Sequence, residues 1–429
     1  MSIIWFVIRT LLTFLSEYIN YIVSRDYETF VHNIAKNLAN ENILYIKLFQ
    51  ALSLNESSEL NKALMNYTDN APYTENDVNI PLLTKVIYEN DLTGDIYNPI
   101  NSGMISLVYK MKRNIDNKDV VLKVKRNHIE RKLNQSMNEV FFFLKLLSFL
   151  PIPILNTFDA HKTIKTNIDF IYTQLDFAQE VKNMQQMKEN CRHMSYIVVP
   201  EVYEEITRKY EDVILMEYLS GKSIENIEPD DYNHYSKLVT KFGFATMLIH
   251  GFTHADLHAG NILFIKDGDI DYKLGILDFG IMITIENSFK NACANLLVDI
   301  METHPRDSAT KLFLLLIEPK EMIAYLTSDE YERIITIFEK FIDEFILKDK
   351  NLNQAKFYQV MRNVNSYLKK NNIVKKYGLY LNENAVKLQV GMAMCHGVAL
   401  HLSKDKYIDV ANEALNEMFH MDIFSESGN

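Results

Sequence analysis

Two short motifs near the middle of the chain constrain the fold more than any other part of the sequence. The first runs from His254 to Asn261 and reads His-Ala-Asp-Leu-His-Ala-Gly-Asn; the second is Leu-Asp-Phe-Gly at 277–280. Between them, apolar runs at 262–265 and 273–277 flank the polar turn 266–269, a pattern that predicts a β-hairpin. Folding this hairpin would bring Asn261 and Asp278 together at its open end. Glycine is scarce in the chain, with 13 in 429 residues, yet five glycines lie between 251 and 280.

The two motifs place two carboxylates and one carboxamide at a spacing that phosphoryl transfer uses. In that arrangement Asp256 lies beside the attacking oxygen, while Asn261 and Asp278 hold the Mg²⁺ that neutralises the phosphates of ATP. The alternative is a loop and a hairpin with incidental acidic residues, which would explain one motif but not both. We therefore expect ATP and Mg²⁺ as cofactors.

Segments nearer the N-terminus resemble the nucleotide-binding half of such an enzyme. A polar turn enters an apolar strand at 99–109, and a second strand at 120–125 carries Lys123 between apolar neighbours. Alternation along the strand puts Val121 and Lys123 on one face, and a lysine buried there needs an anion. The phosphates and a helix carboxylate, for which Glu180 is the candidate, would serve; an exposed strand lysine is the alternative. The predicted nucleotide contacts are Lys123, the loop residues Asn101, Ser102, Gly103 and Met104, and the hinge residues Glu217 and Leu219.

The remaining periodic segments are mostly helical. Apolar spacing predicts helix over 27–66, 140–150 and 172–183, and puts Asp176 and Glu180 on one helical face. Short strands are expected at 196–199 and 213–216. Beyond residue 281 the chain reads as helical, and an apolar stripe from Ile334 to Ile346 predicts an amphipathic helix that faces a core.

Composition excludes several classes of protein. With 48% apolar and 24% charged residues, the chain has the composition of an ordinary globular protein. A net charge of −11 argues against a nucleic-acid partner, because phosphate-backbone binding needs a basic face. The three cysteines are far apart and form no Cys-x-x-Cys pair, so we expect buried thiols and neither a zinc site nor a disulfide framework.

The N-terminal stretch Ile3 to Leu15 is apolar and interrupted by Arg9. It is shorter than the ~20 residues that a membrane-spanning helix needs. We expect a helix packed on a core, with contact to a membrane surface and a targeting role as alternatives. No signal-peptide pattern is evident.

Several of these segments together resemble the ABC1/UbiB/ADCK family of atypical kinase-like proteins. The resemblance covers Lys47-Leu48-Phe49-Gln50, the loop after Pro99, Lys123, the stretch from Gln174 to Glu180, Met216-Glu217, the two central motifs, and Gly397-Val398-Ala399. The family implies a protein-kinase-like fold whose N-terminal helical extension carries a Lys-x-Gly-Gln motif over the active site. Lys47 and Gln50 would be its regulatory residues, and Asp176 the partner of Lys47.

The family also implies membrane-associated support of isoprenoid-quinone or lipid metabolism, with ATPase or small-molecule kinase activity rather than protein phosphorylation. The sequence departs from the family pattern in four places: Phe49 replaces a glycine, Gln174 replaces a glutamate, Ala259 replaces a proline, and Gly103 lies in a loop that is alanine-rich in the family. A weaker clamp between extension and lobe is expected from the change at 174.

We therefore predict an α+β, protein-kinase-like bilobal fold with a helical extension at 1–95, an N-lobe with a helical insert at 96–220, and a mostly helical C-lobe at 221–429. The predicted activity is Mg-dependent ATP hydrolysis or phosphoryl transfer to a small molecule or lipid. The alternatives are an aminoglycoside- or choline-phosphotransferase-like kinase and a nucleotide-binding scaffold without turnover. An isoprenoid phenol or lipid is the expected further ligand, and a cytoplasmic or peripheral membrane location is favoured. The phosphoryl acceptor is not indicated by any motif.

Overall fold

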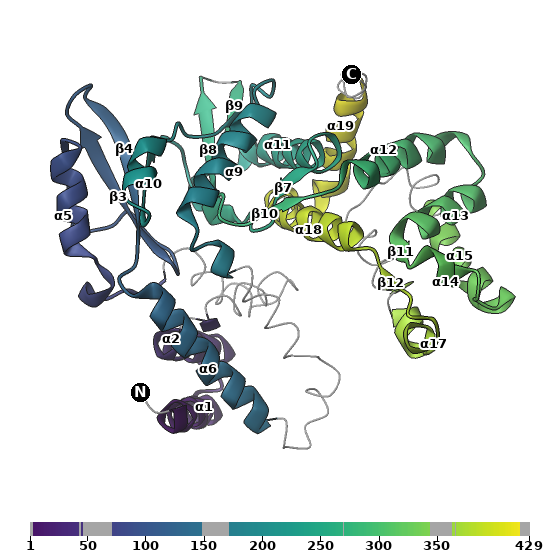
Figure 1. Ribbon diagram of the computed structural model, residues 1–429, viewed down its shortest axis with the longest axis horizontal. Coiled ribbons are helices and arrows are strands. Elements are labelled where there is room, and N and C mark those ends of the chain that lie inside the picture. Colours follow the sequence, from purple (N-terminus) through teal and green to yellow (C-terminus); the bar gives the residue numbers. More distant parts are fainter. Residues whose placement is uncertain are drawn as a thin grey trace. The chain divides into compact units, whose positions relative to one another are not determined.

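The computed structural model describes residues 3–42, 44–45, 71–147, 171–268, 270–343, 363–364 and 366–420. The chain divides into two compact units, one from residues 1–185 and 200–219 and the other from residues 186–199 and 220–429. Figure 1 shows their helices and strands in sequence colours. Each unit is described separately below.

The first unit is built on an antiparallel sheet with strand order β1-β3-β4-β6, in which β2 pairs with the first residues of β3. The strands are β1 (Leu92–Gly94), β2 (Asn101–Ser102), β3 (Ser106–Arg113), β4 (Lys118–Lys125) and β6 (Val213–Glu217). One face packs on α5 (Ile80–Glu89) and α10 (Glu204–Lys209) around Leu83, Tyr109 and Leu122. Because side chains alternate along β4, Lys123 lies on the opposite face. There α9 (Phe177–Asn190), which belongs to this unit up to Gln185, packs its first turns on Ile214.

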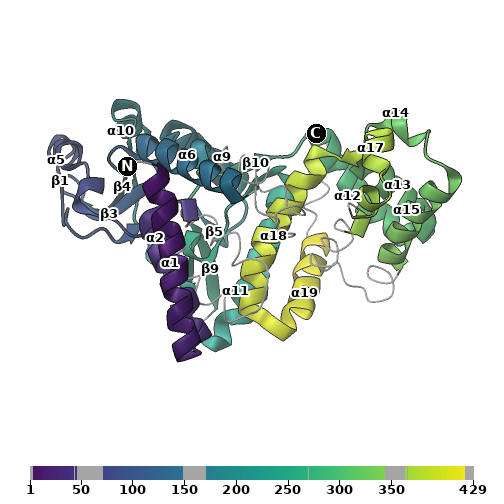
Figure 2. The same ribbon diagram turned by 90° about the horizontal axis from the view of Figure 1, so that it is seen from below.

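Three further helices belong to this unit: α1 (Ile3–Ser24), α2 (Tyr27–Glu41) and α6 (Ile129–Leu147). Helix α1 packs on α2 through Phe6 and Val7, as Figure 2 shows from below. The predicted start of α6 at residue 140 is wrong, because the helix begins eleven residues earlier, at Ile129. Residues 129–139 carry many charged and polar side chains, which hid the apolar positions Ile129 and Leu133 that anchor this helix.

Helix α1 is longer than the predicted apolar stretch. It continues beyond Leu15 to Ser24, and Glu17 within it is buried and accepts hydrogen bonds from Asn33 and Asn37 of α2, each at 3.2 Å. With 22 residues, α1 is the one helix in the described ranges that is long and apolar enough to cross a membrane by length and composition. The length argument against a span therefore fails.

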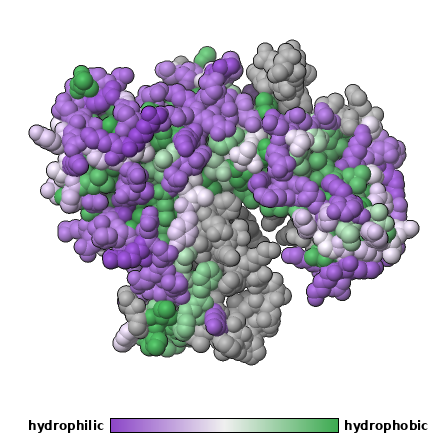
Figure 3. Space-filling view, in the orientation of Figure 1, coloured by the Kyte–Doolittle hydropathy of each residue, from purple (hydrophilic) through white to green (hydrophobic). Residues whose placement is uncertain are grey.

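Much of α1 is nevertheless covered by neither α2 nor α6. Figure 3 shows hydrophobic surface at the lower part of the molecule, where α1 lies in Figure 1. The exposed apolar side chains are Ile4, Trp5, Ile8, Leu11, Leu12, Phe14, Leu15, Tyr18, Ile19, Ile22 and Val23. We call them the α1 apolar face. The prediction of core packing thus holds for one side of the helix only.

The second unit is mainly helical. Its helices include α11 (Tyr232–Phe244), α12 (Asn287–Glu302), α13 (Pro305–Leu316), α14 (Lys320–Ile323), α15 (Ser328–Phe341), α17 (Ile373–Tyr377), α18 (Glu383–Ser403) and α19 (Tyr407–His420). Helices α11, α18 and α19 pack on one another, and Figure 2 shows α18 beside α19. Glycine permits the close approach of α11 to α18, since a Cβ at Gly243 would lie 2.7 Å from Cys395 Cβ.

The strands of this unit form three small sheets. They are β5 (Ile197–Val198), β8 (Ile262–Asp267) and β9 (Asp271–Ile276) in the order β5-β9-β8, β7 (Phe252–His254) with β10 (Met282–Thr284), and β11 (Ile317–Glu318) with β12 (Tyr380–Leu381). The antiparallel pairing of β8 with β9, in which Ile262 faces Ile276, confirms the predicted hairpin. The predicted apolar stripe is also confirmed for Ile334, Ile335, Phe338, Phe341 and Ile342, which are buried. Phe345 and Ile346 lie outside the described residues.

The cysteines behave as the composition predicted in two of three cases. Cys191 and Cys395 are buried, and Cys293 is only partly buried. Burial raises the pKa of each thiol to about 12, so all three are protonated at neutral pH.

Candidate active site

In the first unit, Lys123 and Glu180 form a buried ion pair. The Lys123 Nζ lies 2.6 Å from Glu180 Oε1, and the residues are 7% and 3% exposed. The ring of Phe177 lies 5.5 Å from the ammonium group and adds a cation–π contact. The strand β4 supplies the lysine and the first turn of α9 supplies the glutamate, as the sequence led us to expect. The structure therefore excludes the alternative of an exposed strand lysine.

The start of α9 explains the position of Glu180. Asp176 is exposed and accepts a hydrogen bond from the Gln179 N–H at 2.9 Å, which makes it the N-cap of the helix. The predicted continuous helix over 172–183 is therefore wrong, and Asp176 and Glu180 do not share a helical face. Its suggested partner Lys47, and Gln50 with it, lie outside the described residues.

The loop predicted to cover the phosphates is a tight turn between β2 and β3. The Gly103 N–H donates to the Ser106 carbonyl at 2.9 Å. Met104 and Ile105 are buried in an apolar cluster with Leu44 and Ile129, so the side chain of Met104 serves packing. Ser102 is also buried, and its hydroxyl is bonded within the protein. Only Asn101 and Gly103 of the four predicted residues are partly exposed.

The predicted hinge follows β6. The N–H groups of Glu217 and Tyr218 donate to the carbonyls of Glu201 at 2.8 Å and Asp119 at 3.3 Å. An adenine base would therefore need other backbone groups, and Leu219 is the remaining predicted residue that could supply them.

In the second unit, the loop after β7 positions Asp256 through its backbone. Its N–H donates to His254 Nδ1 at 3.0 Å, and its carbonyl accepts from Asn261 Nδ2 at 2.8 Å. The loop continues into a single helical turn (Ala259–Asn261) that His258 caps by accepting the Gly260 N–H at 3.2 Å. The side-chain nitrogen of Asn261 donates to the Asp256 carbonyl, so a cation would bind the side-chain oxygen Oδ1 of Asn261.

The hairpin brings Asp278 to this loop. The Leu277 N–H donates to the Asn261 carbonyl at 3.0 Å, and Asp278 Oδ1 accepts from the Gly280 N–H at 2.9 Å. His254 completes the connection, because its Nε2 bonds to the Asp278 main-chain carbonyl. The structure thus brings Asp256, Asn261 and Asp278 together in one unit.

The donor atoms of Asn261 and Asp278 fit Mg²⁺. Both supply oxygen, the ligand that Mg²⁺ prefers, and an ion bound with nucleotide phosphates takes only one or two protein ligands. No cluster of three or more His, Cys, Asp or Glu side chains in the described ranges could form a closed metal site.

Two residues with structural roles at these sites were not predicted. His254 joins both motifs, although no pattern in the sequence indicated that its ring would bridge two backbone segments. Arg126, three residues after Lys123, is 4% exposed and bonds to the loop at Ser102. The position of Arg126 directly after an apolar strand was the only feature of the sequence that could have indicated its structural role.

Comparison with known proteins points to one family. A protein of Paramecium bursaria Chlorella virus 1 that carries an ABC-transporter name is 28% identical over 190 residues, covering 44% of this chain and 38% of its own. The Probable serine/threonine-protein kinase abkB of Dictyostelium discoideum is 25% identical over 263 residues, which cover 58% of this chain and 38% of the kinase. The Probable protein kinase UbiB of Shewanella baltica is 28% identical over 202 residues, which cover 46% of this chain and 36% of UbiB. The chain thus spans little more than a third of the length of these relatives.

The family model named ABC1 atypical kinase-like domain matches residues 96–310, half of the chain. This range contains every strand of the first unit's sheet except β1, together with Lys123, Glu180 and both central motifs. Together with the mixed sheet and helices described above, the match confirms the α+β, kinase-like fold class. The chain belongs to the ABC1 atypical kinase-like family.

Proposed function

We propose that this protein binds ATP with Mg²⁺ and either hydrolyses it or transfers its terminal phosphoryl group to a small molecule or lipid. The observation that carries the proposal is the buried pair of Lys123 and Glu180. An ion pair this deeply buried contributes little net stability compared with an apolar pair of the same shape, because both charges lose their hydration. Its retention in a sheet face lined by Val121 and Phe177 favours a role in holding an anionic ligand.

Each candidate residue has a separate task in this proposal. Lys123 contacts the α- and β-phosphates, and Glu180 keeps the ammonium group oriented. Asn261 and Asp278 hold Mg²⁺, which when bound offsets the negative charge of the phosphates. Gly103 lets the loop backbone approach the phosphates, and Leu219 meets the adenine.

Asp256 acts at the acceptor. Its backbone is held on both sides, by the His254 ring at its N–H and by the Asn261 amide at its carbonyl. Its carboxylate is thereby presented from a rigid loop, which suits a group that orients the attacking oxygen and accepts its proton.

We further propose that the acceptor or activator is a lipid or an isoprenoid phenol, and that the α1 apolar face lies on a membrane surface. An exposed apolar surface of this extent is unusual for a monomer and is typical of a binding surface. A membrane-spanning α1 is disfavoured, because it would separate Glu17 from Asn33 and Asn37 and bury a carboxylate in hydrocarbon. A helix lying in the plane of the interface keeps both contacts.

ATP turnover by the purified chain, with and without vesicles or an isoprenoid phenol, tests this proposal. We expect turnover that lipid stimulates and that Asp256→Asn reduces by about 10²-fold or more. Phosphorylation of aminoalcohols without lipid would instead favour the aminoglycoside- or choline-phosphotransferase-like alternative. Nucleotide binding without any product that depends on Asp256 would favour the scaffold.

A further inference from the structure

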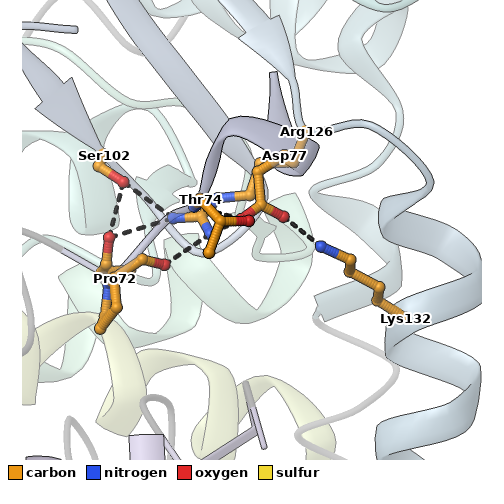
Figure 4. A network of polar contacts seen from close by, with 7 residues as sticks. Pro72, Thr74, Asp77, Ser102, Arg126 and Lys132 are labelled. Carbon is orange, nitrogen blue, oxygen red and sulfur yellow. Dashed lines mark hydrogen bonds and ion pairs between the residues drawn. The ribbon is translucent and has the colours of Figure 1, made fainter. Parts of the chain in front are cut away.

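Arg126 lies at the centre of a buried polar network in the first unit, shown in Figure 4. Its Nη1 donates to the Pro72 carbonyl at 2.8 Å, and its Nη2 donates to the Ala71 carbonyl at 3.2 Å and to Ser102 Oγ at 2.8 Å. Asp77 Oδ2 lies 3.7 Å from Nη1. One guanidinium group therefore joins the segment 71–77 to the loop that follows β2.

Backbone hydrogen bonds also join the segment 71–77, the loop and the two residues that follow β4. The Ala71 N–H donates to the Ser102 carbonyl at 2.7 Å, and the Asn127 N–H donates to the Asp77 carbonyl at 2.7 Å. The N–H of Arg126 itself donates to the Ile105 carbonyl at 2.8 Å. Both ends of the loop 102–105 are thus bonded to Arg126 or to the segment 71–77.

The Ser102 hydroxyl is both a donor and an acceptor within this network. Its hydroxyl donates to the Ala71 carbonyl at 2.7 Å and accepts from Arg126. A hydroxyl has one proton, so Ser102 cannot also donate to a phosphate while these bonds persist. Its place in the loop is that of an anchor.

Asp77 extends the network to α6. It accepts from the Thr74 N–H at 2.8 Å and forms an ion pair with Lys132. The loop, the segment 71–77 and α6 are therefore connected through two buried charged side chains, Arg126 and Asp77, which are 4% and 5% exposed.

We propose that Arg126 is a positioning residue for nucleotide binding, which holds the loop 102–105 in the conformation that receives the ATP phosphates by tying it to the segment 71–77. This inference rests on the proposed ATP-binding function and adds a residue that does not contact the nucleotide. Arginine suits the task because its planar group donates to several acceptors at fixed angles, whereas lysine offers a single point of attachment. The Arg126 Nε has no hydrogen-bond partner in the described part of the chain. Leaving a buried donor unpaired is costly, which argues that the residue is not kept for stability alone.

The test compares three variants of the full chain with the wild type. Arg126→Lys keeps the charge but cannot reach three acceptors, and Ser102→Ala removes a single anchor at little risk to folding. Arg113→Lys is the matched control, because Arg113 pairs with Asp116 in the exposed β3–β4 turn away from the loop. Hydrogen exchange without nucleotide reports on the loop amides, and steady-state kinetics report KM for ATP separately from kcat.

We expect Arg126→Lys to speed exchange at Ala71 and Gly103 by about tenfold, as the loss of one or two hydrogen bonds implies, and to raise KM for ATP by a similar factor. We expect kcat to stay within about twofold, because a properly folded loop still forms when ATP is saturating. Ser102→Ala should give smaller changes in the same direction, and Arg113→Lys should give none.

Unchanged exchange at the loop in Arg126→Lys would overturn the inference, and so would faster exchange with an unchanged KM. A fall in kcat at constant KM would also overturn it, since it would indicate loss of folded protein only. Failure of the wild type to bind ATP would contradict the proposed function itself. Titration of the wild type gives this result before any variant is compared.

Discussion

The ring of His254 bonds to the main-chain carbonyl of Asp278, 24 residues later in the chain. The other ring nitrogen, Nδ1, accepts the N–H of Asp256. Because Nδ1 is an acceptor, the neutral ring carries its proton on Nε2, which donates to Asp278. Complete burial lowers the pKa of His254 despite the two nearby aspartates, so the ring stays neutral at physiological pH. One imidazole thus holds the backbones of Asp256, the proposed catalytic aspartate, and of Asp278, the proposed Mg²⁺ ligand.

His254→Leu should destabilise the second unit by about 2–4 kcal/mol, because it leaves one buried N–H and one buried carbonyl without partners. Urea unfolding measures the change, and ATP turnover should fall with it. His401→Leu is the control, since His401 is exposed on α18. An unfolding midpoint in His254→Leu equal to that of the control would show that the two bonds are not important for the fold.

Lys123→Met should destabilise the first unit by about 3–5 kcal/mol, because it removes the ammonium group that pairs with the buried Glu180 carboxylate. Adding Glu180→Gln removes the remaining charge, and the double variant should recover at least half of the lost stability. Urea unfolding followed by circular dichroism measures the stability of each variant. Additive losses in the double variant would contradict the coupling of the two side chains. ATP binding should be lost in both variants whatever their stability.

The sequence predicted the fold well where local periodicity decides the structure. Alternation placed Lys123 on the face that α9 covers, and the polar turn at 266–269 correctly predicted the pairing of β8 with β9. The family resemblance, drawn from the order of the motifs, was also confirmed. The position of Lys123 and the pairing of β8 with β9 both depend on residues only a few positions apart in the sequence.

The errors arose where a distant or competing contact decides the structure. Asp176 was assigned to a helix by its spacing from Glu180, but its side chain caps the helix instead. The apolar stretch was expected to end at Leu15, but α1 continues through Glu17, whose hydrogen-bond partners lie on α2. Two of the three acceptors of Arg126 are the backbone carbonyls of Pro72 and Ala71, some 55 residues away, which no side-chain pattern reveals.

Asp77 should make the first unit sensitive to acid. Burial alone raises the pKa of Asp77, but the hydrogen bonds from Lys132 and Thr74 and the charge of Arg126 outweigh burial, so the pKa lies below its ordinary value. The unfolded chain binds this proton near pH 3.9 and the folded chain binds it only at lower pH. The stabilisation is therefore complete above about pH 4 and is lost as the pH falls through the lowered pKa.

Urea unfolding of Asp77→Asn and of the wild type, followed by circular dichroism at pH 7 and at several values below pH 4, measures this effect. The wild type should be the more stable of the two at pH 7, and its advantage should shrink below pH 4. A difference that does not change with pH would contradict the proposed charge interaction.

The α1 apolar face should bind vesicles, and the charge of its surroundings predicts which ones. Residues 3–42 contain three basic and four acidic residues, so attraction to anionic lipid adds little. We therefore expect flotation with neutral phosphatidylcholine vesicles as well as with anionic ones. Leu12→Glu with Ile19→Glu should abolish flotation, because both positions are exposed on the α1 apolar face. Ile270→Glu, at an exposed turn of the second unit, is the control. Self-association of the wild type without vesicle binding would assign the face to a second copy of the chain.

In the proposed function, Asp278 holds the Mg²⁺ that accompanies ATP. Equilibrium titration of the full chain with ATP, in the presence and absence of Mg²⁺, tests it most directly. We predict saturable binding that Mg²⁺ strengthens in the wild type, and a loss of about tenfold or more in affinity together with the Mg²⁺ effect in Asp278→Asn. Equal binding of ATP by wild type and Asp278→Asn, with or without Mg²⁺, would contradict the account.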